Sequence, residues 1–322
     1  MGVLSKRLRE RLVSGPPPLL DAAMGTELQR REARTDLPLW SARPLVEDPE
    51  LVWTIHNDEV AAGADIITAD TFRTHARSLA KGGFGDRAGE LSALAVRLAH
   101  QAAATPGREV FVAGSLSPLE DCYRPDLVPD DAALDREHGA QARFLADAGV
   151  DLILAETHNT IREATAAGRA ARATGLPIVV SLVTDGTGRL LSGEPVEEAA
   201  AALVALGIHA LGINCVPARR LVDDLARLAK AAPGMSLAAY GNLGLPSDGP
   251  GWRFAEELPP EEYASEAEAW IALGARIVGG CCGTTPAHTR ALASLRKQTP
   301  LYLRERADKE QTPLSLRERG KG

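Results

Sequence analysis

The sequence predicts a single (β/α)₈ barrel, a closed ring of eight parallel strands surrounded by eight helices. Short apolar or β-branched runs alternate eight times with longer stretches rich in Ala, Leu, Glu and Arg. These runs are apolar on both faces, as in Asp151–Ala155, which is typical of parallel strands covered by helices. The span from Pro18 to Lys297 also accommodates the roughly 250 residues that such a barrel needs.

The predicted strands are the apolar runs themselves, each followed by polar residues or a turn. In chain order they are Pro18–Asp21, Ala64–Thr71, Val110–Ser115, Val150–Thr157, Pro177–Thr184, Ala210–Cys215, Ser236–Asn242 and Ala275–Cys281.

The predicted helices lie between the strands, and several have typical ends. Pro286 follows Thr285 in the order expected for a first-turn proline after a capping hydroxyl, and Gly63 and Gly149 stand where helices should stop. The ranges are Pro49–Ala62, Asp86–Ala104, Asp131–Ala148, Ile161–Ala173, Val196–Leu206, Ala218–Ala231, Pro260–Leu273 and Pro286–Lys297.

The alternative fold is an open, doubly wound sheet, since strand order is invisible in a sequence. A G-x-G-x-x-G phosphate motif after the first strand would favour it, but the segment from Asp21 to Glu27 contains one glycine. We expect three parts: an N-terminal helical segment (1–17), one barrel domain (18–297) and a charged C-terminal tail (298–322) that is frayed or disordered.

Charge and composition exclude several classes of function. A formal net charge of −7 gives no general attraction to nucleic acid or to an anionic membrane. No apolar run approaches the roughly 20 residues of a membrane span, and the N-terminus lacks the apolar core of a secretion signal. We therefore expect a cytoplasmic protein without a nucleic-acid or membrane partner; the sequence does not give its oligomeric state.

Three of the four cysteines fall at predicted strand ends, where barrels of this kind form their active sites. Cys215 ends the sixth strand, Cys281 ends the eighth, and Cys282 follows it. Neighbouring residues of a strand point to opposite faces, so this pair can face one point only where flanking glycines let the backbone turn. Cys122 stands alone, and we interpret it as chemically inert.

Three thiolates suit Zn²⁺, which prefers four tetrahedral ligands, so three protein ligands leave one position for a substrate. The spacing therefore predicts a catalytic zinc site of Cys215, Cys281 and Cys282. The alternative is a pair of buried small residues or a redox-active vicinal disulfide at Cys281 and Cys282.

Four motifs resemble the homocysteine S-methyltransferase family over about Pro18–Leu295. They are Gly279-Gly-Cys-Cys-Gly-Thr-Thr-Pro, Gly212-Ile-Asn-Cys, Asp21-Ala-Ala-Met-Gly-Thr-Glu and Ala64-Asp-Ile-Ile-Thr-Ala-Asp-Thr-Phe. This family includes betaine-dependent and S-methylmethionine-dependent enzymes and the homocysteine domain of cobalamin-dependent methionine synthase.

The resemblance implies an enzyme of methionine biosynthesis in which the three cysteines hold zinc and the sulfur of homocysteine joins its coordination. It also implies that Asp21 and Glu156 hold the amino group of homocysteine, and that backbone amides near Ala22 and Thr71 face its carboxylate. Ala22 replaces a glycine that is usual in relatives, which puts its carboxylate contact in question.

The expected reaction is attack of a zinc-activated thiolate on a methyl group carried by a cationic donor. Candidate aromatic partners for such a cation are Phe72, Tyr123, Tyr240 and Trp252; His75 and His158 are weaker polar candidates.

A small sulfonium such as S-methylmethionine is the first choice of donor. The alternatives are a methyl group delivered by a separate corrinoid protein, or a betaine-like donor. Outside this reaction class remain a vicinal-dithiol oxidoreductase on a barrel and a catalytically silent zinc-binding module.

Overall fold

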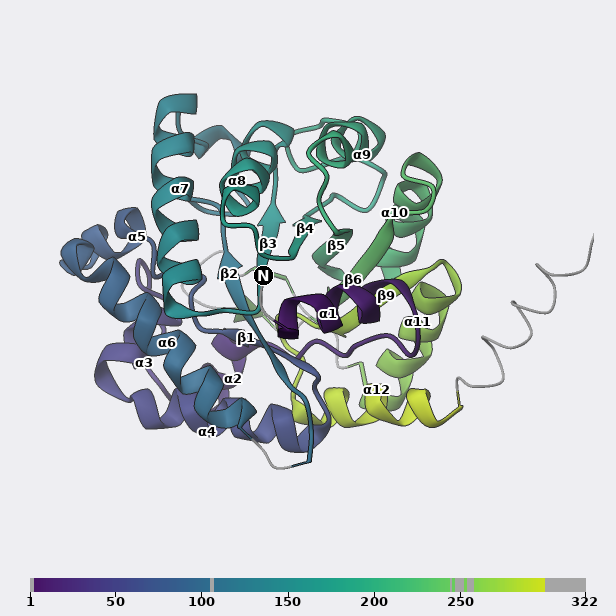
Figure 1. Cartoon of the computed structure of the whole chain (residues 1–322), viewed down its shortest axis with the longest axis horizontal. Coiled ribbons are helices and arrows are strands. Elements are labelled where there is room, and N and C mark those ends of the chain that lie inside the picture. Colours follow the sequence, from purple (N-terminus) through teal and green to yellow (C-terminus); the bar gives the residue numbers. More distant parts are fainter. Residues whose placement is uncertain (1–2, 105–106, 244, 247–251, 254–257, 299–322) are drawn as a thin grey trace, which may run out of the picture.

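The computed structural model is an α/β fold built on one curled parallel sheet of seven strands (Figure 1). It describes residues 3–104, 107–243, 245–246, 252–253 and 258–298. The strand order β1-β2-β3-β4-β5-β6-β9 follows the chain, and neighbouring strands pair in parallel register. The strands are β1 (Ile66–Ala69), β2 (Phe111–Leu116), β3 (Leu152–His158), β4 (Ile178–Leu182), β5 (Ala210–Pro217), β6 (Ser236–Asn242) and β9 (Ala275–Gly280).

Seven of the eight predicted strands are thereby confirmed, and a continuous strand at the first, Pro18–Asp21, is not shown. At this segment two isolated parallel bridges join Leu19 to Val278 of β9 and Leu20 to Ile66 of β1. Six backbone hydrogen bonds link this segment to the β9 side and the β1 side of the sheet; among them, the amide of Leu20 donates to Val278 at 2.8 Å and that of Asp21 to Ile66 at 3.0 Å. The segment thus lies between the two edge strands of the sheet.

All eight predicted helices are present, with ends within two residues of expectation. They are α4 (Pro49–Ala62), α6 (Ala88–Ala103), α7 (Asp131–Ala148), α8 (Ile161–Ala173), α9 (Val196–Ala205), α10 (Ala218–Ala231), α11 (Pro260–Ala272) and α12 (Pro286–Gln298). Side chains cap several of them: Asp130 accepts a hydrogen bond from the amide of Ala133 at 2.8 Å, and Gly63 and Gly149 end their helices in the left-handed conformation.

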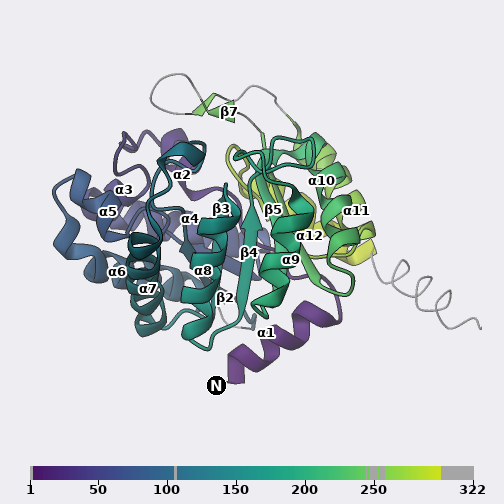
Figure 2. The same ribbon diagram turned by 90° about the horizontal axis from the view of Figure 1, so that it is seen from above.

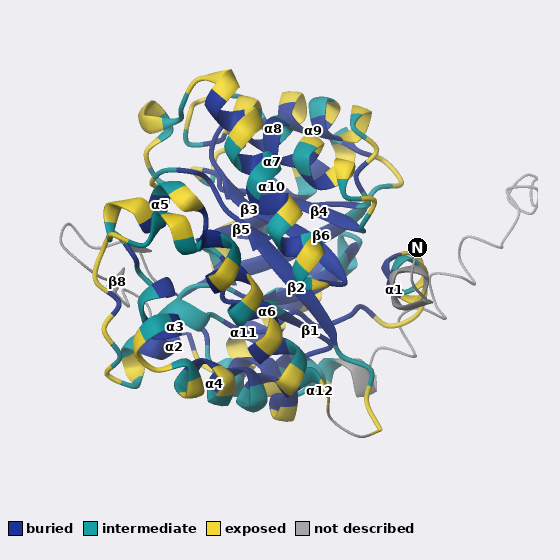
Figure 3. Ribbon diagram, turned by 60° about the vertical axis from the view of Figure 1, so that its left-hand side comes forward, coloured by how far each residue is buried: buried dark blue, intermediate teal, exposed yellow. Residues whose placement is uncertain are grey.

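The helices cover the outer face of the sheet, with their buried sides inward and their exposed sides to solvent (Figure 3). Alternate strand residues point the other way and form a second, inner apolar cluster that includes Ile66, Phe111 and Tyr240. The N-terminal helix α1 (Val3–Val13) adds Leu8 and Leu12 to this cluster, and both are fully or almost fully buried. In Figure 2, α1 lies at the end of the sheet opposite β7 (Leu245–Pro246).

Short elements that the apolar pattern did not predict decorate the strand–helix connections. They are α2 (Met24–Arg30), α3 (Ala42–Glu47), α5 (Ala76–Lys81), two 3₁₀ turns (Gly85–Arg87 and Pro125–Leu127) and the antiparallel pair β7 and β8 (Trp252–Arg253). The predicted tail, apart from Gln298, lies outside the described residues. Within the described residues, none of the helices has the length and hydrophobicity that crossing a bilayer requires.

Candidate functional site

A cavity of about 260 Å³ opens where the sheet strands end at their carboxyl termini. Its wall contains residues from the ends of β1, β2, β3, β5, β6 and β9, together with the chain that follows Leu20. Its lining includes Cys215, Cys281 and Cys282, together with four carboxylates and one arginine. The charged members are Asp21, Asp70, Asp121, Glu156 and Arg73. With four acidic side chains and one basic one, the cavity favours a ligand that carries positive charge.

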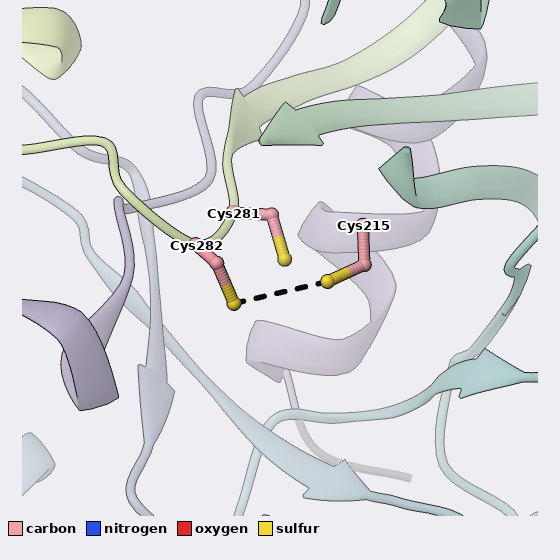
Figure 4. A group of neighbouring side chains, drawn as sticks. All are labelled: Cys215, Cys281 and Cys282. Carbon is pink, nitrogen blue, oxygen red and sulfur yellow. Dashed lines mark hydrogen bonds between the residues drawn. The ribbon is translucent and has the colours of Figure 1, made fainter. Parts of the chain in front are cut away.

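The sulfur atoms of Cys215, Cys281 and Cys282 all lie within 4.8 Å of one another and point toward a common space (Figure 4). The sulfurs of Cys215 and Cys282 are 3.8 Å apart. Two sulfur ligands at about 2.3 Å from a tetrahedral zinc ion lie about 3.8 Å apart, so this spacing fits such an ion. The predicted convergence of the three thiols is present, and the cluster could hold a metal ion.

Local backbone geometry directs the three cysteine side chains toward one another. The register of β5 against β6 shifts between Asn214 and Pro217, and within that bulge Cys215 has a φ of 55°. A bulge re-aims a side chain that a regular strand would send to the other face. Near the carboxyl end of β9, close packing also requires glycine, because a Cβ on Gly279 would lie 2.6 Å from that of Leu20. The bulge of β5 and the close packing at the end of β9 thus both position the thiols.

Hydrogen bonds make Cys215 the most acidic of the three thiols. The pKa of the Cys215 thiol lies well below its ordinary value, mainly because the thiols of Cys281 and Cys282 donate hydrogen bonds to its sulfur. The hydroxyl of Tyr123 lies 3.0 Å from its sulfur, and the side chain of Asn242 contributes a further hydrogen bond. The Oδ1 atom of Asn242 is buried and has no partner within the described residues. The cluster can thus hold a thiolate, which is the form that binds metals.

Asp21 and Glu156 both lie in the cavity wall and are at most 9% exposed. The carboxylate of Asp21 accepts hydrogen bonds from the amide and hydroxyl of Thr68 at 2.7 and 2.9 Å. That of Glu156 accepts one from the hydroxyl of Ser115 at 2.5 Å. Burial raises the pKa of Asp21 and brings that of Glu156 to about 7. Two desolvated carboxyl groups in one cavity suit a substrate ammonium group.

Asn214 connects the two strand ends that carry this chemistry. Its Oδ1 accepts a hydrogen bond from the amide of Thr157 at 3.0 Å, and its Nδ2 donates to the Thr157 hydroxyl at 2.8 Å. Thr157, with a φ of 64°, lies in the bulge of β3 next to Glu156, and Asn214 precedes Cys215. One buried amide side chain therefore fixes the carboxylate side of the cavity relative to the thiol side.

The two backbone amides expected near a carboxylate are engaged within the protein. Ala22 lines the cavity, but its amide donates to the side chain of Glu59. The amide of Thr71 donates to the carbonyl of Ala69 at 2.6 Å, and Thr71 is not among the described residues that line the cavity. Neither amide is free to meet a substrate carboxylate in this structure.

Glu59 is a buried acid that the sequence did not single out. It lies on α4, is 2% exposed, and accepts a hydrogen bond from Thr289 at 2.7 Å. Burial raises its pKa to about 7. Because the folded protein holds this proton more tightly than the unfolded chain, the resulting stabilisation is present below about pH 4.5 and is lost as the pH rises through about 7.

We expect Glu59→Gln to reduce the loss of stability at rising pH. Between pH 5 and pH 8 the free energy of unfolding of the variant, relative to the wild type, should increase by about 2–3 kcal/mol, because the variant has no carboxyl group to ionise. Urea unfolding of the zinc-free proteins at both pH values measures this difference. If the free energy of unfolding of the variant relative to wild type is the same at pH 5 and at pH 8, Glu59 ionises with an ordinary pKa.

The weaker sequence candidates divide between the cavity and the surrounding core. Phe72, Tyr123 and Tyr240 line the cavity, and the side chain of Trp252 lies outside the described part. His75 and His158 are buried and are not among the described lining residues.

Cys122 does line the cavity, but burial raises the pKa of its thiol and it is not part of the three-sulfur cluster. Trp40 and Ser41, which the sequence analysis missed, complete one wall. They lie between α2 and α3, in a connection without an apolar repeat that could have indicated them.

Comparisons with known proteins identify the family. The family model described as homocysteine S-methyltransferase matches residues 18–295. Methionine synthase of Mycobacterium tuberculosis is 31% identical over 290 residues, which are 85% of this chain and 24% of that protein. The chain thus spans about a quarter of the length of this relative.

Two further relatives match along nearly their whole length. The homocysteine S-methyltransferase YbgG of Bacillus subtilis is 29% identical over 86% of this chain and 93% of its own. The crystal structure of the metallated homocysteine methyltransferase MmuM from Escherichia coli superimposes with a TM-score of 0.77 at 31% identity, covering 89% of this chain and 99% of that one. Because the family model extends over most of the sequence and the MmuM fold agrees with it, this chain belongs to the homocysteine S-methyltransferase family.

Proposed function

We propose that this enzyme transfers a methyl group to the thiol of L-homocysteine in a reaction that depends on zinc held by Cys215, Cys281 and Cys282. The observation that carries the proposal is a cluster of three cysteine sulfurs in the same cavity as two buried carboxyl groups. YbgG and MmuM bear names that state homocysteine methylation. The product is methionine.

The donor set fits zinc because it consists of three thiols within 4.8 Å of one another, of which Cys215 and Cys282 lie at tetrahedral spacing and Cys215 is strongly acidified. When bound there, Zn²⁺ would keep the homocysteine sulfur deprotonated at neutral pH while leaving it nucleophilic. Asp21 and Glu156 then hold the substrate ammonium group, so that the thiol reaches toward the cysteines. Tyr123 and Asn242 stabilise the negative charge of Cys215 through hydrogen bonds.

The methyl donor in this proposal is a small sulfonium such as S-methylmethionine. The homocysteine sulfur forms a bond to the methyl carbon while the bond from that carbon to the donor sulfur breaks. The donor leaves as a neutral thioether, and the negative charge of the thiolate and the positive charge of the sulfonium cancel. No proton moves in this step, so the protein's task is alignment and exclusion of water.

The proposal includes a closed barrel, a division of the chain into three parts and a cytoplasmic location. The segment Pro18–Asp21 would act as the eighth member of the ring, closing the barrel between β9 and β1, and its hydrogen bonds to both strands support this. Residues 1–17, 18–297 and 298–322 remain our proposed division of the chain, with the reaction taking place in the cytoplasm.

A second candidate donor is a methylated corrinoid carried by a separate protein. The similarity to methionine synthase over about a quarter of that protein favours it. The test is to incubate zinc-loaded protein and homocysteine with S-methylmethionine, betaine or a methylated corrinoid, and to measure methionine. We expect product with S-methylmethionine; product with the corrinoid alone would overturn our choice of donor.

The same preparations test whether the cysteines serve redox chemistry. A vicinal-dithiol oxidoreductase would form no methionine with any donor and would show reversible oxidation of Cys281 and Cys282. A zinc-binding module without catalytic activity would retain the metal and form no methionine. Either result would contradict the proposed methyl transfer.

A further inference from the structure

We infer that Asp70 is a specificity residue that selects methyl donors carrying a positive charge; the inference rests on the methyl transfer proposed above. Asp70 follows directly after β1 and lines the cavity that contains the three cysteines. It is 3% exposed, so its carboxyl group is removed from bulk water. Burying a carboxylate costs free energy unless a positive or hydrogen-bonding partner offsets it.

One oxygen of Asp70 has no such partner in the protein. Its Oδ2 atom is buried and makes no hydrogen bond within the described residues. Asp21, in the same cavity, differs because both of its oxygens accept hydrogen bonds from Thr68. A buried polar atom without a partner in a cavity wall indicates a group that pairs with a ligand.

The cation that would pair with Asp70 does not come from the chain itself. Arg73 lies three residues further on and also lines the cavity, but its Nη1 donates to the backbone carbonyl of Glu120 at 3.2 Å. Among the described residues no ion pair within 4.0 Å involves Asp70. Burial raises the pKa of Asp70 to about 7, while the nearby hydroxyl of Ser41 opposes the rise. A bound cation would favour the ionised form.

The surroundings of Asp70 assign it to the donor rather than to homocysteine. Asp21 and Glu156 already provide two carboxyl groups for the amino group of homocysteine. Asp70 instead lies beside Ser41, and the aromatic side chain of Trp40 lines the same cavity; the ring of Phe72 also lines it but already carries the guanidinium of Arg73, 5.4 Å from its centroid. Aromatic faces attract cationic methyl groups. This combination suits a sulfonium or a quaternary ammonium group.

The charge changes of the reaction determine which kinetic constant Asp70 controls. The donor is positively charged when it binds and loses that charge as the methyl group leaves. A fixed carboxylate therefore stabilises the bound donor at least as much as the transition state. Removing the negative charge should weaken donor binding without lowering kcat, whereas a merely structural defect would lower kcat.

The experiment compares wild type with Asp70→Asn and the smaller neutral variant Asp70→Ser, all zinc-loaded and with S-methylmethionine as the donor. Asp135→Asn, an exposed aspartate on α7, is the matched control. At saturating homocysteine we expect both Asp70 variants to raise the KM for the donor about tenfold or more, since hydrogen bonds to charged groups have effects of this size. The kcat should not fall, and the KM for homocysteine should stay unchanged.

The outcomes separate this inference from the function on which it rests. If wild type forms no methionine from S-methylmethionine, the proposed donor is wrong and the inference falls with it. If wild type is active but the KM for S-methylmethionine is unchanged in a folded Asp70 variant, the inference alone is overturned. A raised KM for homocysteine with an unchanged KM for the donor would also overturn it, because Asp70 would then bind the acceptor.

Discussion

Replacing Cys215 by alanine should remove both the metal and the activity. We expect wild type to bind about one zinc ion per chain and the variant to lose more than about 100-fold in zinc affinity, because residues that only support metal ligands already account for 10–100-fold. Methionine formation should fall to about 3% of wild type or less, since only about this fraction of a free thiol is ionised at neutral pH without a metal. Elemental analysis and a zinc-competition titration measure the two effects.

Cys122→Ala is the control for this experiment. Cys122 lines the same cavity, but its sulfur is not in the three-sulfur cluster, so this variant should retain its zinc. A Cys215→Ala protein that holds zinc as tightly as wild type would show that the cluster is not a metal site. Equal zinc loss in both variants would instead indicate a general disturbance of the cavity.

Glu156→Gln should have the second largest effect, on the binding of homocysteine. The substitution keeps the size of the side chain and an oxygen that can accept the hydrogen bond from Ser115, but it removes the negative charge. Losing one partner of a buried charged pair costs about 2 kcal/mol or more, which is about 30-fold in the KM for homocysteine. The KM for the methyl donor should change little, because Asp70 is inferred to serve the donor.

A substrate without an amino group tests the assignment of Glu156 directly. With 4-mercaptobutyrate, which has the thiol and carboxylate of homocysteine but no ammonium group, Glu156→Gln and wild type should have similar kinetic constants. The exposed Glu90→Gln substitution on α6 is the matched control. If the variant loses as much activity with 4-mercaptobutyrate as with homocysteine, Glu156 does not bind the amino group.

Much of the fold can be predicted because it depends on apolar patterning. The eight helices and seven strands follow from buried runs alternating with amphipathic stretches. The first strand could not be distinguished from a bridging segment, since four residues beginning at Pro18 contain too little pattern. The short helices α2 and α3 were also not predicted, because they lie in connections where local packing rather than periodicity decides the structure.

The candidate site could be predicted in composition but only partly in geometry. Strand ends indicated the three cysteines, Asp21 and Glu156. The left-handed conformation of Cys215 could not be predicted, because the residues Asn214-Cys-Val contain no sequence signal for a bulge. Likewise, the engagement of the Ala22 amide by Glu59 depends on how α4 packs, which is a tertiary effect.

The position of α1 has a consequence for handling the protein. Leu8 and Leu12 close the end of the fold away from the cysteines, and Arg11 forms an ion pair with Asp65 at 3.1 Å. A shortened chain that starts at Pro18 would expose the inner apolar cluster to solvent and promote aggregation. Every residue that lines the cavity with the cysteines would still be present. Trimming of the amino terminus during production should therefore spare the first seventeen residues.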